Sequence, residues 1–219
     1  MTLRLKGSNT GDVSIAAPAT AGNNTLTLPT SNGSANQYLK NGSTAGTLEF
    51  GTFEGLVLTR KTAVASTSGT AIDFTNISSL SGSVYRVTVM LDGVSLSGSS
   101  NLMLRIGDSG GIENTGYLGG AAISETTNLF ASRTNGFCLS YNNNSAAANT
   151  HNGSVILTNM TGNTWTVQGA TFASGYNAGA FIGGTKTLSG TLDRLQVYSN
   201  NGTDTFDAGQ INVIYEVQS

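Results

Sequence analysis

Side chains that could carry out chemistry are sparse in this sequence of 219 residues. His151 is the single histidine, which excludes a zinc site built from several histidines. It lies in a stretch rich in Asn and Ala, and we expect it to be exposed and to take no part in chemistry. Cys138 is the single cysteine, so no intrachain disulfide can form, and its apolar neighbours predict a small core residue rather than a nucleophile.

The twelve acidic residues are dispersed along the chain. Asp204 and Asp207 are close enough to share a calcium ion, yet a calcium loop requires more oxygen ligands at defined spacing. We therefore expect both carboxylates to bond loop amides. A retaining glycosidase needs two carboxyl groups about 5 Å apart, and nothing in the sequence points to such a pair. The sequence predicts no catalytic residues, no metal, no cofactor and no enzymatic activity.

The composition describes a chain that can bury a core beneath a weakly charged surface. Only 10% of the residues are charged, against about 25% in average proteins, while 38% are hydrophobic. The net charge is −2 and the ten Lys and Arg are scattered, so we expect no binding to nucleic acid. The first residues lack the apolar stretch of a signal peptide, and no run approaches a membrane span. We therefore expect neither secretion nor membrane insertion.

Residues 53–219 read as a series of strands in which apolar and polar residues alternate. The stretch SVILTNMTGNTWTVQG gives the strongest hairpin signal, with Trp165 and Val167 on its core face. The alternation in residues 84–91 places four side chains on one face: Tyr85, Val87, Val89 and Leu91. About eight strands without helical periodicity predict an all-β head, an antiparallel β-sandwich of the jelly-roll kind.

Two glycine- and asparagine-rich stretches, residues 107–120 and 141–153, read as polar loops. Loops carry binding residues more often than scaffolds do, so these stretches are the best candidates for a contact surface. Tyr117, Tyr141 and Tyr176 are candidate surface-binding residues, because glycan sites often use an exposed aromatic ring beside polar groups. Each of these rings also fits a position that caps the core, and the sequence leaves both interpretations open.

Residues 1–52 differ from the rest because their apolar residues come in short bursts between turn signals. One burst predicts a strand over Thr25–Leu28, and each expected strand has a single apolar face. About eight apolar side chains cannot form a self-sufficient core in a segment of this length. Residues 1–52 are therefore expected to be a stem that borrows its core, either from the head at 53–219 or from copies of itself.

The stem sequence carries four motifs in order: V-x-I-x-A-P from Val13, T-L-T-L-P from Thr25, N-G-S-A-N-Q-Y-L from Asn32, and G-T-L-x-F from Gly46. This run resembles a module common in appendage proteins of tailed bacteriophages, tail fibres above all, with those of marine and cyanobacterial phages nearest. The last aromatic of that module is often Trp and is Phe50 here. The ending NNGTDTFDAGQINVIYE also resembles the end of phage fibre-type β domains.

The resemblance implies a structural protein on the virion surface, made in the host cytoplasm and not secreted. Such modules usually occur in homotrimers, in which three chains wrap one axis. By that analogy the residues near the trimer axis are Leu26, Leu28, Leu39 and Phe50. The implied partners are two further copies of the chain and other virion proteins of the tail or the capsid.

Three functions fit these expectations. The first is a short homotrimeric fibre-like appendage, because only one shaft-type module precedes the head. The second is a capsid decoration, or cement, protein that clamps neighbouring capsomers. The third is a carbohydrate-binding module or adhesin, for which a host-surface glycan would be the partner.

Overall fold

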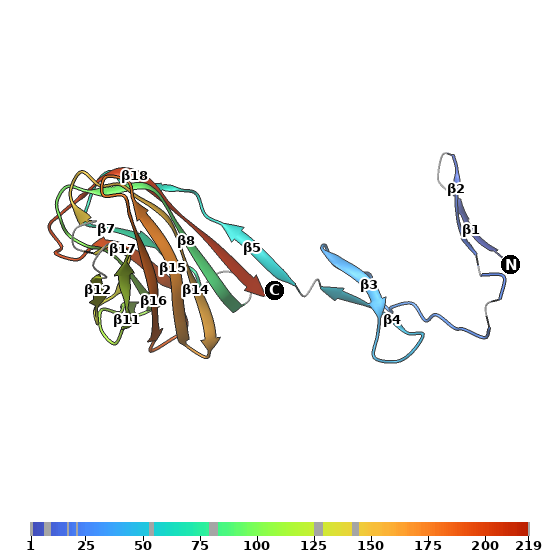
Figure 1. Cartoon of the computed structure of the whole chain (residues 1–219). Helices are drawn as coiled ribbons and strands as arrows, with labels where there is room; N and C mark the ends of the chain where they lie inside the picture. Colours follow the sequence, from blue (N-terminus) through green and yellow to red (C-terminus); the bar gives the residue numbers. More distant parts are fainter. Residues whose placement is uncertain are drawn as a thin grey trace. The chain divides into compact units, whose positions relative to one another are not determined.

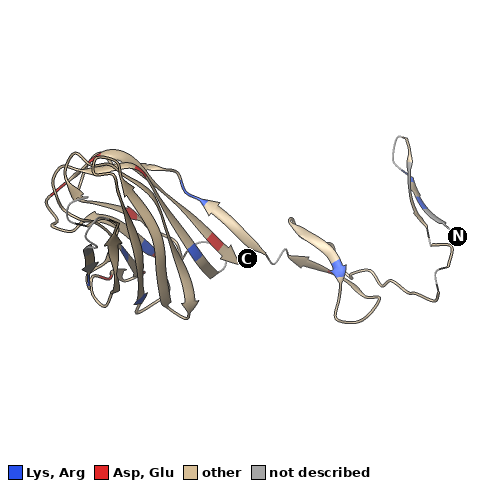
Figure 2. Cartoon of the chain, in the orientation of Figure 1, with Lys and Arg blue, Asp and Glu red and all other residues tan. Residues whose placement is uncertain are grey.

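A computed structural model describes residues 2–6, 10–16, 18–20, 22–52, 55–78, 83–124, 129–141 and 145–218. These ranges contain strands, turns and irregular segments but no α-helix, so the expected all-β class is confirmed. The chain divides into two compact units, Met1–Glu54 and Gly55–Ser219, close to the expected division after residue 52. Charged residues are few in both units (Figure 2).

The first unit contains two antiparallel hairpins (Figure 1). They are formed by β1 (Thr2–Lys6) with β2 (Asp12–Ala16) and by β3 (Gln37–Asn41) with β4 (Leu48–Thr52).

The prediction of a strand over Thr25–Leu28 is wrong, because the segment forms only an isolated parallel bridge, between Thr27 and Thr47. Two backbone hydrogen bonds, of 2.7 and 2.8 Å, join Thr27 to Gly46 and Leu48. The next hydrogen bond of a parallel ladder would need a donor at Pro29, which has no N–H, so the pairing stops there.

The second unit is a sandwich of two antiparallel sheets (Figure 1). The larger sheet has the order β12 (Leu129–Ser132), β11 (Leu118–Ile123), β16 (Ala178–Thr187), β15 (Thr164–Ala173), β14 (His151–Thr161), β8 (Ser83–Leu96), β18 (Phe206–Gln218) and β5 (Leu56–Arg60), with β6 (Val64–Ala65) also on β18. The smaller sheet has the order β10 (Gly111–Ile112), β9 (Leu102–Asp108), β17 (Arg194–Ser199) and β7 (Ala71–Phe74), with β13 (Phe137–Cys138) also on β9.

One hydrophobic core lies between the two sheets, because the inward residues of both sheets belong to one cluster. Trp165 and Val167 are buried in it, which confirms the predicted core face of the β14–β15 hairpin. The loop of this hairpin is Gly162-Asn163, and Gly162 takes a φ of 52° that suits glycine. The predicted inward residues of the last two strands are also buried: Leu195, Val197, Ile211, Val213, Tyr215 and Val217.

Strand β8 departs from its predicted alternation at one residue. Val87, Val89 and Leu91 are buried as expected, but Tyr85 is 42% exposed. The pairing of β8 with β18 shifts at this point, where Val84 lies opposite Val217 and Arg86 lies opposite Glu216. This bulge leaves Tyr85 without a partner and lets Val84 pack against the core in its place.

The expectation of about eight strands in the head is too low, because the described part of this unit contains β5 to β18. The stretches expected as loops, 107–120 and 141–153, contribute residues to β9, β10, β11 and β14. Strands β11 and β16 have the sequences LGGAAI and AGAFIGGTKT, whose small residues hide any alternation of size. They form strands because both edges of each are paired along the sheet.

Candidate functional site

The residues expected near a trimer axis carry large exposed apolar surface. Leu26 and Leu28 are each 68% exposed and Leu39 is 48% exposed, while Phe50 is half-buried. The β3–β4 register places Leu39 directly opposite Phe50, at the distance where cross-strand side chains pack. The two leucines at 26 and 28 flank the single bridging residue Thr27.

The first unit has no apolar core of its own among its described residues. Every buried hydrophobic side chain of the described structure lies between Ile72 and Val217, in the second unit. The ring of Phe50 lies against Gly33, where an added Cβ would approach the ring to 2.7 Å. This contact covers part of one aromatic ring and leaves the leucines uncovered. The described residues of the first unit therefore do not cover its own apolar surface.

The second unit begins with a strand, β5, that also exposes apolar side chains. In the described part of the larger sheet, β5 is an edge strand whose hydrogen-bonded neighbour is β18. Its residues Leu56, Val57 and Leu58 are 63%, 43% and 68% exposed. Successive residues of a strand point to opposite faces, so apolar side chains are uncovered on both faces of this edge. Unprotected apolar edges favour pairing with another chain.

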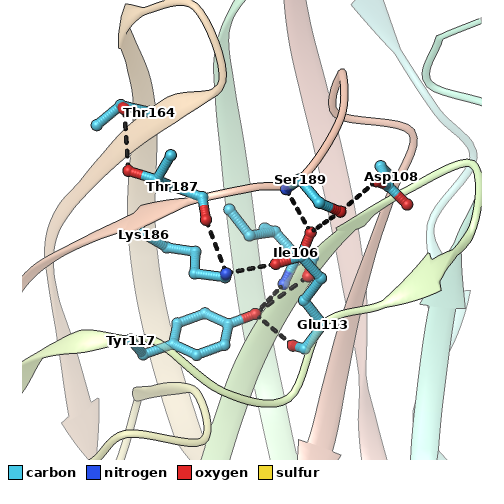
Figure 3. Close-up of polar contacts among 8 residues, drawn as sticks. All are labelled: Ile106, Asp108, Glu113, Tyr117, Thr164, Lys186, Thr187 and Ser189. Atoms are coloured by element: carbon cyan, nitrogen blue, oxygen red, sulfur yellow. Dashed lines mark hydrogen bonds and ion pairs between the residues drawn. The ribbon is translucent and has the colours of Figure 1, made fainter.

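A cluster of polar side chains lies where β9, β10 and β16 end (Figure 3). The carboxylate of Glu113 forms an ion pair with Lys186 and accepts a hydrogen bond of 2.7 Å from the backbone N–H of Ser189. Ser189 Oγ lies 2.8 Å from Glu113 Oε1 and 2.7 Å from Asp108 Oδ2, and it can donate its proton to one of them at a time. Two carboxylates and one hydroxyl therefore meet at this point.

Tyr117 belongs to the same cluster and is fully buried, so the expectation of a surface-binding residue is wrong for it. Its hydroxyl accepts a hydrogen bond of 2.8 Å from Ile106 N–H and donates to the carbonyl of Glu113 at 2.8 Å (Figure 3). Its ring meets Phe137 edge-on at 4.9 Å between centroids. Tyr117 is a core residue whose polar end is satisfied by backbone groups.

The electrostatics of the cluster oppose a role in acid catalysis. Hydrogen bonds from Ser189 and from the N–H of Gly110 hold the pKa of Asp108 below its usual value. Burial alone would raise the pKa of Glu113, but its bonds from Lys186 and Ser189 outweigh burial and lower the pKa. A general acid needs a carboxyl group whose pKa is raised toward the working pH. The geometry instead fits a brace between the end of β9 and the end of β16.

The two other candidate tyrosines are half-buried. Tyr141 packs against the main core and against a small cluster of Ile123, Ala178 and Ala180, and Tyr176 packs against that small cluster. Both rings therefore cover core residues, as in the second of the two interpretations that the sequence left open, a ring that caps the core.

Asp204 accepts a hydrogen bond of 2.8 Å from the backbone N–H of Ser100, as expected for a loop aspartate. Asp207 is exposed in β18. No group of three or more potential metal-binding side chains occurs within the described ranges.

The single histidine and the single cysteine are both buried. Cys138 is a core residue as predicted; its thiol donates to the carbonyl of Ser140 at 2.7 Å, and burial raises its pKa to about 11. His151 was expected to be exposed, and this expectation is wrong, because it opens β14 and is 3% exposed. Burial lowers the pKa of His151 to about 4, so its side chain is neutral at physiological pH. Neither residue is accessible for catalysis.

The sequence analysis missed two exposed aromatic residues, Phe130 on β12 and Phe181 on β16, which are 67% and 61% exposed. Both lie on the outer face of the larger sheet, in register with Ala122 on the strand between them. The available signal was a phenylalanine surrounded by small residues, as in AGAFIGG, where no neighbouring side chain is large enough to cover the ring.

Comparison with protein-family models, with curated proteins and with solved structures gives no match for this chain. In the described ranges, no helix has the length and apolar character needed to cross a membrane.

Proposed function

We propose that this protein is a non-enzymatic structural component of a bacteriophage virion, a short homotrimeric fibre-like appendage on the particle surface. Residues 1–52 act as the stem that trimerises and attaches to tail or capsid proteins, and residues 53–219 form the head. The observation that carries this proposal is the exposed apolar surface of a first unit that has no buried hydrophobic side chain among its described residues.

Association between copies accounts for this surface in physical terms. Leu26, Leu28 and Leu39 would lose water-exposed apolar area, at about 25 cal/mol for each Å² that becomes buried. A low-charge chain has little electrostatic repulsion to oppose association, since only 10% of its residues are charged. A closed symmetric assembly also covers strand edges that would otherwise pair without limit.

The edge strand β5 supports the same proposal from the second unit. Leu56 follows Thr52, the last residue of β4, by four positions, a span of at most about 14 Å in extended chain. Stems held together would therefore keep the β5 strands of neighbouring copies at high effective concentration. The exposed Leu56, Val57 and Leu58 could then be covered by the same residues of other copies.

A capsid decoration protein is the second candidate. It is favoured by the same exposed leucines of the first unit, because the surface of a capsid can cover apolar side chains as well as further copies of the chain can. In that case the capsid surface would cover part of Leu26, Leu28 and Leu39. Binding of a labelled antibody to native virions, located by electron microscopy, distinguishes the tail from the capsid.

Light scattering on the purified full chain tests the trimer. The expected particle mass is three times the chain mass of 22.4 kDa, and a particle of 22.4 kDa at micromolar concentration would refute the proposal. The double substitution Leu26→Asp/Leu28→Asp places two carboxylates per copy in the shared core and should dissociate the stem. Leu118→Asp is the matched control, because Leu118 is also a leucine that is 68% exposed but belongs to the head.

The control variant should keep the mass of the wild-type protein. A double variant that stays trimeric would show that the head holds the copies together and that the stem residues are not at the axis. Both variants should keep the β-sheet circular dichroism of the wild type, because the head has its own core between the sheets.

A further inference from the structure

The outer face of the larger sheet carries a shallow slot at the edge opposite β5 in the strand order. Its volume is about 460 Å³, within the range of small-ligand sites. The residues that line it are Gly119, Gly120, Ala122, Phe130, Ser132, Phe181, Ile182 and Gly183. They come from the three neighbouring strands β12, β11 and β16.

The register of these strands gives the slot two aromatic walls and a floor of small residues. Ala122 on β11 is paired with Phe130 on one side and with Phe181 on the other, so the two rings are separated by two strand spacings, about 10 Å. Gly120 pairs with Ser132 and Gly183 in the next outward-facing row. Side chains stand roughly perpendicular to a sheet, so the two phenylalanines rise on either side of this floor.

The floor is open above Gly183. A Cβ added at this glycine would meet no atom within 4 Å, and its φ is not in the left-handed region. The described chain therefore does not fill the space above Gly183, which follows Phe181 by two positions on the same face of β16. Between the two rings themselves stands Ala122, whose side chain is only a methyl group. A ligand that enters the slot would contact an aromatic ring on each side and backbone below.

The chemistry of the lining selects the kind of ligand. No charged residue lines the slot among those that the structure describes. The charge of a phosphate, a carboxylate or an ammonium group would therefore be uncompensated there. A ring in van der Waals contact with both walls needs about 3.5–4 Å on each side, which a spacing of about 10 Å allows. Ser132 supplies a hydroxyl at the wall formed by β12. A puckered ring with apolar C–H faces and hydroxyl groups at its rim has these properties.

We propose that this slot binds one sugar ring of a neutral glycan, stacked between Phe130 and Phe181. The strand order places the slot at the edge of the sheet farthest from β5, the strand that follows the stem (Figure 1). This inference gives the head of the proposed appendage a ligand, and it rests on the proposed function only for where that glycan comes from, the surface of the host. Sugar binding itself requires only the folded head.

The experiment measures binding of the full chain to a panel of neutral oligosaccharides built from glucose, galactose or mannose, by glycan array and then by calorimetry. Phe130→Ala and Phe181→Ala each remove one stacking wall, and each should weaken binding about fivefold to tenfold. Gly183→Val should abolish binding by filling the slot, and it should fold normally because the added atoms enter open space. Phe172→Ala is the control: this ring is 46% exposed on β15 but does not line the slot.

Three results would overturn the inference. The first is that the wild type binds no neutral oligosaccharide in the panel, and the second is binding that the three slot variants leave unchanged. The third is a loss of oligomer mass in Phe181→Ala or Gly183→Val, which would make the slot an interface between copies. A wild type that is monomeric yet binds sugar through the slot would refute the proposed trimer and leave this inference standing.

Discussion

Glu113→Gln tests whether the polar cluster at the end of β16 stabilises the head. The substitution keeps the shape of the side chain and an oxygen that can accept from Ser189, but it removes the negative charge beside Lys186. Lys186 is only 6% exposed, so its ammonium group would be left buried without a counter-ion. Breaking a buried ion pair in this way costs about 3–5 kcal/mol, and we expect about 3 kcal/mol because Glu113 retains 21% exposure.

Lys186→Met should cost less, about 1–2 kcal/mol. Glu113 would still accept the hydrogen bond of 2.7 Å from the backbone N–H of Ser189 and would reach water through its exposed part. The double variant Glu113→Gln/Lys186→Met carries no uncompensated charge. Its loss of stability should therefore be smaller than the sum of the two single losses by about 1–2 kcal/mol.

Urea unfolding followed by circular dichroism at pH 7 measures the three losses, with all variants at the same protein concentration so that self-association contributes equally. A stabilising ion pair between Glu113 and Lys186 is refuted if Glu113→Gln lies within 0.5 kcal/mol of the wild type, the usual range for surface substitutions. It is also refuted if the two single losses add, since residues that share an ion pair should show coupling.

Two further predictions concern buried side chains of the head. Trp165→Ala empties a core site that is 2% exposed and should cost about 3–5 kcal/mol in urea unfolding, whereas an unchanged midpoint would show that Trp165 does not fill the core. His151 has a pKa of about 4 in the folded protein, so below its unfolded value of 6.5 only the unfolded chain gains the proton. The free energy of unfolding should therefore fall by about 2–3 kcal/mol between pH 6.5 and 4. His151→Gln should abolish this dependence on pH. The lowered pKa values of Asp108, Glu113 and Asp193 should reduce the free energy of unfolding only below about pH 4.5, and equally in both proteins. An equal slope in the two proteins above pH 4.5 would contradict the assignment of the slope to His151.

The sequence was sufficient to predict strands that alternate large apolar with polar residues. In β14, β15, β17 and β18 many of the inward side chains are Val, Leu, Ile, Trp and Tyr, and their alternation with polar residues makes these strands visible in the sequence. In β11 and β16 the residues are mostly Gly and Ala, and pairing on both edges determines the strand instead. That pairing depends on other parts of the chain and has no local signal.

The bulge at Tyr85 and the burial of His151 were missed for related reasons. A bulge is a property of two strands, since it is defined by the extra residue of β8 against β18, and the sequence of β8 alone reads as regular. His151 lies in a polar stretch, but its pairing with Val94 and Ala173 places it inside the larger sheet. In both cases tertiary pairing overrides the local pattern.

The polar cluster was missed because its members are far apart in the chain. Glu113 is separated from Lys186 by 73 positions and from Ser189 by 76, and neither spacing matches a known motif. The aromatic slot was missed because the ring on β12 and the ring on β16 face each other across β11 only through the strand order β12-β11-β16. By contrast, the shortage of core residues in the stem is a matter of composition, and the structure shows no buried hydrophobic side chain among the described residues of Met1–Glu54.

The two exposed apolar surfaces of the head differ in a way that separates their roles. At β5, apolar residues are uncovered on both faces, and the outer row of backbone N–H and C=O groups has no strand beside it in the described sheet. A surface of this kind is best covered by another polypeptide, which can supply both a strand and side chains. The slot lies on one face of the sheet, and its floor strands β11 and β16 are paired on both edges although β12 is an edge strand of the described sheet. An occupant between the two rings therefore contacts side chains and one face only. The strand edge therefore suits a second copy of the chain, and the space between Phe130 and Phe181 suits a small ring.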